Sequence, residues 1–281
     1  MVEARRPELD EDLLHQRLVA SGLYSRLSRL RATGSTNADL LAAAEEPDFD
    51  IKWPHLSVLT AEEQTGGRGR LARAWSSPRG SSLSTSVVLR PSLPIEQRHW
   101  LSLAAGLALV EVLEERGVEA ALKWPNDVQV AGRKIAGILA AVPPRSPGTV
   151  IVGCGINVLL TADQLPTPTS TSLLVEIGRA GCDIAATGAA EGARLRTELL
   201  ADWLERFAGL VGRIQGAGDI GPVRDDIISA ISTVGQQVRV ELPDGTAVRG
   251  AAVAVENSGA LTVEVSGWRR TFAVGDVFHL R

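Results

Sequence analysis

Two lysines are the residues whose type and position most favour chemistry on a negatively charged ligand. Lys123 and Lys134 lie in the segment LKWPNDVQVAGRKIAGIL (residues 122–139), although only three of the chain's 29 basic residues are lysines. A lysine ammonium is a compact charge on a slim stem, whereas the arginine guanidinium is a wide planar fork. A narrow site beside a phosphate or a reacting carbonyl therefore favours lysine. A pair of surface lysines on a hairpin stays open as the alternative.

A glycine–arginine segment, GGRGRLAR (residues 66–73), is the second candidate. It places Arg68, Arg70 and Arg73 within six residues. Guanidinium forks bind phosphate or carboxylate oxygens in a bidentate way, and glycines leave the backbone open to a ligand. The segment lacks the Gly-Lys-Ser/Thr of a P-loop, and no helix opens directly behind it as in a dinucleotide fingerprint. It predicts an anion-binding loop, with a solvated loop or a weak RNA contact as the alternative.

Two shorter segments carry groups that can meet a polar ligand. GSTN (residues 34–37) brings hydroxyls and an amide to the start of a predicted helix, where they either cap the helix or bind a small polar head group. GCGIN (residues 153–157) has glycines that allow a ligand to approach the backbone, or that form a tight turn at a strand end.

Other catalytic chemistries find little support in the sequence. The four histidines lie outside these segments, no HExxH motif occurs, and no base is evident beside Cys154 or the serines. The shared feature of the candidate segments is anion handling by arginine, lysine and glycine backbone. This favours nucleotidyl or phosphoryl chemistry, in which positioning and electrostatics supply most of the catalysis.

The elements expected around these segments form an α/β (α+β) fold with a mixed sheet. Helices are predicted over residues 8–22, 34–46, 95–116 (the longest), 189–210 and 222–231, and loops over 64–75 and 166–174. Strands are predicted over residues 27–33, 55–63, 81–91, 118–124, 127–132, 134–142 and 149–158. After Thr233, five short strands separated by turn signals predict a small antiparallel barrel. The expected domains are therefore residues 1–232 and 233–281.

Composition limits the broad class of the protein. The 281 residues are 44% hydrophobic with a formal net charge of −4, which disfavours a general nucleic-acid-binding surface. No apolar run is long enough to span a membrane, and the charged first twenty residues lack a signal-peptide core. Cys154 and Cys182 lie far apart without metal-type spacing, as expected of buried, reduced thiols. These features predict a cytoplasmic protein without membrane contact.

Four motifs in this order resemble the biotin protein ligase family: GSTN, EEQTGGRGRLARAW (residues 62–75), LKWPNDVQVAGRKIAGIL and VGCGINV (residues 152–158). The resemblance spans roughly residues 30–160, and the C-terminal barrel resembles that family's small SH3-like domain. It implies a catalytic domain with the biotin/lipoate ligase and class II synthetase-like fold. Lipoate ligases share this fold, but the GRGR segment together with KWPND and GRKIAGIL resembles the biotin branch.

The resemblance implies a reaction in two steps. The carboxylate of biotin attacks the α-phosphate of MgATP, which gives biotinyl-5′-AMP and pyrophosphate. A lysine of a biotin carboxyl carrier domain of an acyl-CoA carboxylase then takes up the biotinyl group. The implied cofactor is Mg²⁺, whose ligands stay unassigned, and the implied assembly is a monomer or homodimer.

The resemblance also assigns roles to individual residues. The implied catalytic residues are Lys123, Arg68, Lys134 and Asp127. The implied biotin-binding residues are Ser35, Thr36, Asn37, Gln64, Arg68, Gly69, Arg70, Lys134 and Gly137. The implied nucleotide-binding residues are Arg70, Arg73, Trp75, Lys123, Asn126 and Asn157.

Some members of the family carry an N-terminal winged helix and also act as repressors. Here about 33 residues precede the GSTN motif, which is too few for a module of three helices and a wing. We therefore expect no binding to DNA. Two other functions remain as alternatives: a lipoate–protein ligase or transferase, and a ligand-sensing protein without catalysis.

Overall fold

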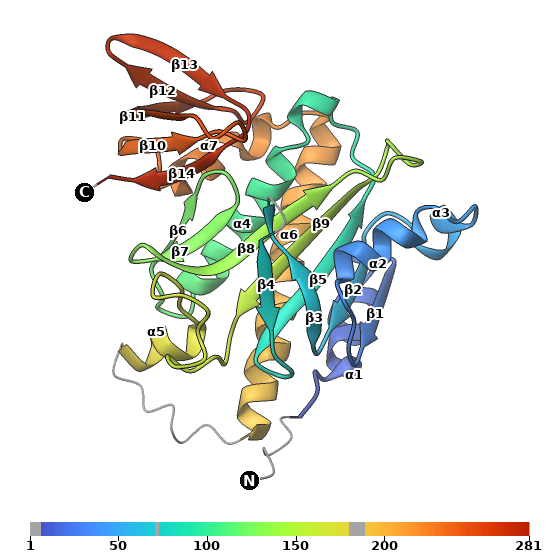
Figure 1. The fold of residues 1–281 in the computed structure, drawn as a ribbon. Coiled ribbons are helices and arrows are strands. Elements are labelled where there is room, and N and C mark those ends of the chain that lie inside the picture. The colour runs from blue at the N-terminus through green and yellow to red at the C-terminus, as the bar shows by residue number, and fades with distance from the viewer. Residues whose placement is uncertain (1–6, 71–72, 180–188, 281) are drawn as a thin grey trace.

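A seven-stranded mixed sheet forms the centre of the molecule (Figure 1). The computed structural model of the protein describes residues 7–70, 73–179 and 189–280. In sheet order the strands are β1 (Arg26–Leu30), β2 (Ser57–Ala61), β5 (Ser82–Leu89), β9 (Val150–Asn157), β8 (Arg133–Ala141), β7 (Asp127–Val130) and β6 (Ala120–Lys123). β1 and β2 are parallel and the other neighbours are antiparallel. The seven strands predicted for the first domain are confirmed.

Two helices cover one face of this sheet, α4 (Trp100–Glu114) and α6 (Ala189–Ala217), and α7 (Gly221–Ala230) packs against both of them. Nearly every side chain of α4 is buried, and the buried Trp203 of α6 donates its indole N–H to the carbonyl of Ala105 at 2.9 Å. The prediction that residues 95–116 form the longest helix is wrong. Residues 95–97 are a separate 3₁₀ turn, whereas α6 continues past residue 210 because Val211 and Ile214 still pack into the core. None of the helices in the described ranges combines the length and apolar character needed to cross a bilayer.

The other face carries α2 (Thr36–Ala43) and a two-stranded ribbon, β3 (Gln64–Arg68) and β4 (Ala74–Ser77). The Ser35 side chain accepts from the N–H of Ala38 and caps α2. The prediction of a loop over residues 64–75 is wrong in part, because Gly67 pairs with Trp75 and Arg68 with Ala74. The remaining short helices are α1 (Glu11–Leu14) with a π-helical turn at His15–Val19, α3 (Phe49–Lys52) and α5 (Leu173–Arg179).

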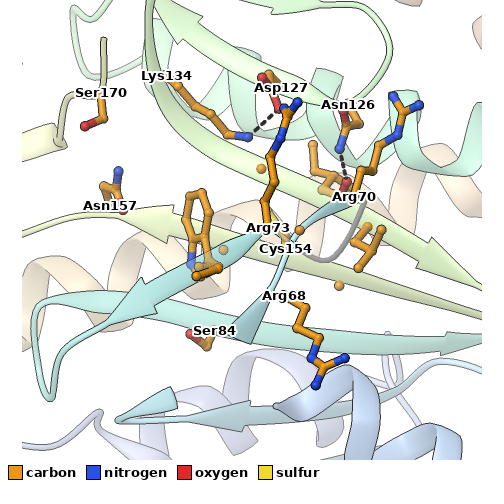
Figure 2. A pocket seen from close by; sticks show the side chains of 18 of the residues that line it. Arg68, Arg70, Arg73, Ser84, Asn126, Asp127, Lys134, Cys154, Asn157 and Ser170 are labelled. Atoms are coloured by element: carbon orange, nitrogen blue, oxygen red, sulfur yellow. Dashed lines mark hydrogen bonds and ion pairs between the residues drawn. The ribbon is translucent and has the colours of Figure 1, made fainter. Parts of the chain in front are cut away.

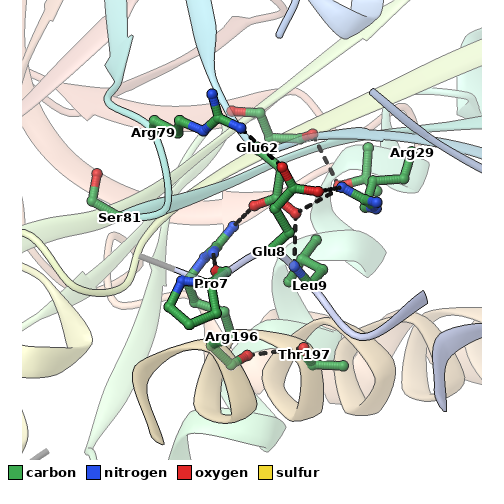
Figure 3. Close-up of polar contacts among 12 residues, drawn as sticks. Pro7, Glu8, Leu9, Arg29, Glu62, Arg79, Ser81, Arg196 and Thr197 are labelled. Atoms are coloured by element: carbon green, nitrogen blue, oxygen red, sulfur yellow. Dashed lines mark hydrogen bonds and ion pairs between the residues drawn. The ribbon is translucent and has the colours of Figure 1, made fainter. Parts of the chain in front are cut away.

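A buried ion pair fixes the chain close to the ribbon (Figure 3). Glu62 follows β2 and lies two residues before Gln64. Its carboxylate accepts from Arg196 Nη2 at 2.5 Å and from the N–H of Leu9 at 2.7 Å, and neither charged side chain is more than 1% exposed. Removing one partner of such a pair leaves an uncompensated buried charge, so we infer that it holds the N-terminal segment and α6 against the start of β3.

The C-terminal part is a five-stranded antiparallel sheet, which confirms the five predicted strands. In sheet order they are β13 (Trp268–Phe272), β12 (Leu261–Val265), β11 (Ala247–Val255), β10 (Gln237–Glu241) and β14 (Asp276–His279). The turn between β11 and β12 docks on the first part of the chain: the indole N–H groups of Trp100 and Trp124 donate to the carbonyls of Asn257 and Gly259. The domain division after residue 232 stays a prediction.

Candidate active site

One cavity is lined by every residue that the sequence assigned to the site (Figure 2). It lies on the sheet face that carries α2 and the ribbon. Its walls come from the start of α2, from β3 and β4, from the turn between β6 and β7, and from β8 and β9. The predicted residues that line it are Ser35, Thr36, Asn37, Gln64, Arg68, Gly69, Arg70, Arg73, Trp75, Lys123, Asn126, Asp127, Lys134, Gly137 and Asn157.

A network of neutral polar groups forms one end of the cavity. Gln64 Oε1 accepts from the N–H of Thr36 at 3.0 Å. Ser86 Oγ lies 2.7 Å from both Thr36 Oγ1 and Asn37 Oδ1, and the Asn37 amide donates to the carbonyl of Leu139 at 2.9 Å. The helix cap and the polar wall are therefore the same segment: the capping role of GSTN is confirmed, and its binding of a head group stays a prediction. These linked groups are pre-oriented to bind a small ligand with both donors and acceptors.

Glycines in β8 and β9 allow two large side chains to pack against the sheet. A β-carbon at Gly153 would lie 2.4 Å from Asn37 Oδ1, and one at Gly155 would lie 2.4 Å from Trp75 Nε1. A β-carbon at Gly137 would lie 3.3 Å from the same indole ring. GCGIN is thus part of a strand, so its interpretation as a tight turn is wrong. Its glycines admit side chains of the protein that themselves form the wall of the cavity.

Positively charged groups from separate segments converge in the cavity. Lys134 Nζ forms an ion pair with Asp127 at 2.6 Å, and Arg73 forms one with Asp276 of β14. Burial lowers the pKa of Lys123, and the carboxylates of Asp127 and Asp276 oppose that shift. The alternative of two surface lysines on a hairpin is therefore wrong. Lys123 ends β6 and Lys134 lies in β8, and both side chains line the cavity.

The three arginines of the glycine–arginine segment do not lie together. Arg70 and Arg73 lie on the side of Asp127, while Arg68 lies toward the N-terminal elements (Figure 2). Burial also lowers the pKa of Arg70, whose Nη1 has no hydrogen-bond partner among the residues that the structure describes. A buried guanidinium with a free N–H group is a ready partner for an anion.

Two walls of the cavity were missed by the sequence analysis. The first is β14, whose Phe278 ring lies 5.7 Å from Lys123 Nζ, and the second is the Pro/Thr/Ser segment 166–170. Ser84 and Ser86 of β5 were also missed. Asn126 and Asn157 already donate to the carbonyls of Ile138 and Thr171 at 2.7 and 3.0 Å, so each holds a wall in place.

The acidic groups of the cavity bear on metal binding. Within the described ranges, no three His, Cys, Asp or Glu side chains are grouped as metal ligands. Asp127 and Asp276 line the cavity. This set suits Mg²⁺, which is usually held by one or two carboxylates together with substrate phosphates and water.

Burial raises the pKa of the Cys154 thiol, as expected of an unreactive buried cysteine, whereas Cys182 lies outside the described residues.

Known families, relatives and solved structures are similar to this chain over most of its length. Residues 31–157 match the biotin/lipoate A/B protein ligase family and residues 233–280 match the biotin protein ligase C terminal domain. The chain is 38% identical to the biotin–[acetyl-CoA-carboxylase] ligase of Mycobacterium tuberculosis, over 98% of this chain and 97% of that protein. It is 31% identical to the Paracoccus denitrificans protein of the same name, over 89% and 98%. The structure of biotin protein ligase from Aquifex aeolicus with biotin and ATP superposes with a TM-score of 0.71 at 26% identity, covering 92% of this chain and 100% of that one. The chain belongs to the biotin protein ligase family.

Proposed function

We propose that the protein is an ATP-dependent biotin protein ligase. It first joins biotin to AMP and then transfers the biotinyl group to a lysine of a carrier domain. Relatives across nearly the whole chain are named biotin–[acetyl-CoA-carboxylase] ligases, and the Aquifex aeolicus relative binds biotin and ATP. The observation that carries the proposal is the convergence of Arg70, Arg73, Lys123 and Lys134 on one cavity that also has a neutral polar end.

The first step requires two anions to meet. A carboxylate oxygen of biotin attacks the α-phosphorus of ATP, the bond to the β-phosphate oxygen breaks, and pyrophosphate leaves. Coulomb repulsion between the reactants opposes this approach, and cations fixed in a partly buried site lower it without reorganisation. We assign this task to Lys123 and Lys134, with Arg70 and Arg73 on the phosphates. Mg²⁺ bound with ATP would add further neutralisation of phosphate charge, and Asp127 and Asp276 are the carboxylates that would hold it.

The neutral polar end suits the uncharged ring system of biotin. We assign Ser35, Thr36, Asn37 and Gln64 to this head group, with Ser86 keeping Thr36 and Asn37 in place. Trp75 lies between this end and Lys134, whose Nζ is 5.5 Å from the indole ring, and we assign Trp75 to the adenine side. We assign Arg68, Gly69 and Gly137 to biotin, with Arg68 also among the catalytic residues, and Asn126 and Asn157 to the nucleotide.

In the second step the amine of the carrier lysine attacks the acyl carbon of biotinyl-5′-AMP. An amide bond forms, the acyl–phosphate bond breaks and AMP leaves, while the amine loses a proton. We assign Asp127 to the region of this amine. The carrier is inferred to be the biotin carboxyl carrier domain of an acyl-CoA carboxylase, and the reaction is inferred to take place in the cytoplasm.

Labelling of a purified carrier domain tests the proposal. With biotin, ATP and Mg²⁺, the protein should biotinylate one carrier lysine, and replacement of that lysine by arginine should abolish the label. Lipoate in place of biotin should give no labelled carrier. Tight biotin binding without any labelling would instead support a ligand sensor. A gel shift with duplex DNA should show no sequence-specific complex, and a tight specific complex would refute the expected absence of repressor activity.

A further inference from the structure

The Pro/Thr/Ser segment before α5 is attached to the sheet at Lys134. The N–H of Lys134 donates to the carbonyl of Thr169 at 2.8 Å, and the N–H of Thr171 donates to the carbonyl of Lys134 at 2.8 Å. Lys134 and Ser170 form an isolated parallel bridge. Thus the backbone groups of Lys134 that face away from β7 are satisfied by the wall of the cavity. Asn157 Nδ2 donates to the carbonyl of Thr171 and ties the same wall to β9.

One carboxylate holds both sides of this attachment. Glu176 of α5 is 7% exposed and accepts from Arg133 through Nη2 at 3.0 Å and through Nε at 3.2 Å. It also accepts from Arg179 at 2.7 Å and from the hydroxyl of Thr171. Arg133 precedes Lys134 in β8, and Thr171 follows Ser170 in the wall. Charge-assisted bonds to a carboxylate are stronger than neutral ones, and the bidentate geometry restricts orientation.

Glu176 does not line the cavity itself. Consecutive side chains of a strand point to opposite faces, so Lys134 faces the cavity while Arg133 reaches Glu176 behind it. A β-bulge separates Lys134 from Ala136 in the pairing with β7, and bulges re-aim the side chains beside them. The direction of Lys134 therefore depends on the wall as well as on β7.

We propose that Glu176 is a positioning residue for biotin activation, which fixes segment 166–170 and the direction of Lys134 at the nucleotide side of the cavity. This inference rests on the proposed function. The neutral polar end is built from α2, β3 and β5 with the Leu139 carbonyl of β8, and among the described residues its hydrogen bonds involve neither Glu176 nor Arg133. Loss of the Glu176 contacts should therefore weaken use of ATP without weakening biotin binding.

Glu176→Gln tests this, because it removes the charge and keeps the shape. The KM for ATP in biotin-dependent pyrophosphate exchange should rise by about ten- to a hundredfold, since small misplacements of catalytic groups cost factors of this size. The Kd for biotin should change far less, because the hydrogen bonds of the neutral polar end stay in place, and Glu176→Asp should recover part of the loss. The matched control is Glu198→Gln, which breaks the exposed pair with Arg194 on α6 and should leave both constants unchanged.

A second variant covers the case in which Glu176→Gln does not fold. Arg133→Lys keeps the charge but loses the bidentate contact, and should raise the KM for ATP in the same direction by a smaller factor. Equal losses for ATP and biotin, or unchanged constants in a folded variant, would overturn the positioning role. Wild-type protein without any biotin-dependent exchange would instead refute the proposed function, so the two failures are distinguishable.

Discussion

Lys134 Nζ lies 2.6 Å from Asp127, while Lys123, which faces Asp127 across the β6–β7 ladder, has no carboxylate within ion-pair distance in the ranges that the structure describes. The two lysines of the cavity therefore differ in how their positive charge is balanced. The charge of Lys134 is paired with the carboxylate of a neighbour, whereas the charge of Lys123 is partly buried and balanced only at longer range. A phosphate or carboxylate that enters the cavity gains more from Lys123 than from a solvated cation.

Replacing Lys123 by alanine should remove the activation step while sparing ligand capture. We expect formation of biotinyl-5′-AMP in a single turnover to slow by about a hundredfold or more, as when a preorganised electrostatic donor is lost. Calorimetric biotin binding should change far less, because the polar end of the cavity stays intact. Lys52→Ala is the control, since Lys52 is exposed and pairs with Asp48. Near-normal single-turnover activation in Lys123→Ala would refute its role.

Lys123 also predicts that activity falls at a lower alkaline pH than an ordinary lysine would give. Burial lowers its pKa, so as pH rises the ammonium loses its proton below the ordinary lysine value of about 10.4. The kcat/KM for ATP, which reports ionisations of the free enzyme, should fall with that loss. Lys123→Arg keeps its charge at high pH, so its remaining activity should lack this fall. A fall at the same pH in both proteins would assign it to another group.

Gly153→Ala should weaken biotin binding selectively. Its β-carbon would lie 2.4 Å from Asn37 Oδ1, so Asn37 has to move and its bonds to Ser86 and Leu139 are lost. Overpacking of this kind costs about 1–3 kcal/mol, and we expect a loss of biotin affinity on that scale by calorimetry. The control is Gly212→Ala on the exposed side of α6, where a β-carbon meets nothing within 4 Å. Equal affinity of Gly153→Ala and wild type would count against the assigned head-group end.

Arg70→Gly should let the activated intermediate escape. A guanidinium that holds the phosphate retains biotinyl-5′-AMP until the carrier arrives, so its loss should increase labelling of bystander amines relative to the carrier. The ratio of biotin on albumin to biotin on the carrier domain measures this. Arg31→Gly, an exposed position outside the cavity, should behave as wild type. An unchanged ratio in Arg70→Gly would exclude a retaining role.

His99 predicts a loss of stability in mild acid. Burial, with a smaller contribution from Arg70, lowers the pKa of this histidine to about 4, from 6.5 in the unfolded chain. As pH falls from about 6.5 to about 4, His99 binds a proton in the unfolded state but not in the folded state. The free energy of unfolding therefore drops by up to about 3 kcal/mol. Urea titrations of wild type and His99→Gln across this range should show a shallower pH slope in the variant. Parallel slopes would contradict the assignment.

The positions of the site residues were predictable to the extent that short motifs carry them. The β7–β8 hairpin that carries Lys134 formed as expected, since Ala131 and Gly132 both adopt positive φ and β7 turns directly into β8. Ser84 and Ser86 could also have been found. With Ser82 they occupy every second position in the first half of β5, SLSTSVVL, and a period of two that puts hydroxyls on one face indicates a polar cavity.

The remaining walls depend on contacts between distant parts of the chain. Asp276 and Phe278 reach the cavity from a C-terminal sheet that contacts Trp124 through Gly259, more than a hundred residues later in the chain. Segment 166–170 has the composition of an ordinary surface loop, and its bridge to Lys134 is set by Glu176. The β3–β4 ribbon has the glycines of a loop, yet its backbone pairs because the sheet below supports Trp75. Local periodicity encodes none of these relationships.

Exchange of labelled pyrophosphate into ATP tests the central claim most directly, because it requires the reversible joining of the two anions in the cavity and needs no carrier protein. We expect exchange by the wild-type protein that depends on biotin, is not supported by lipoate, and is lost in Lys123→Ala. A wild-type protein that binds biotin and ATP yet catalyses no biotin-dependent exchange would contradict it.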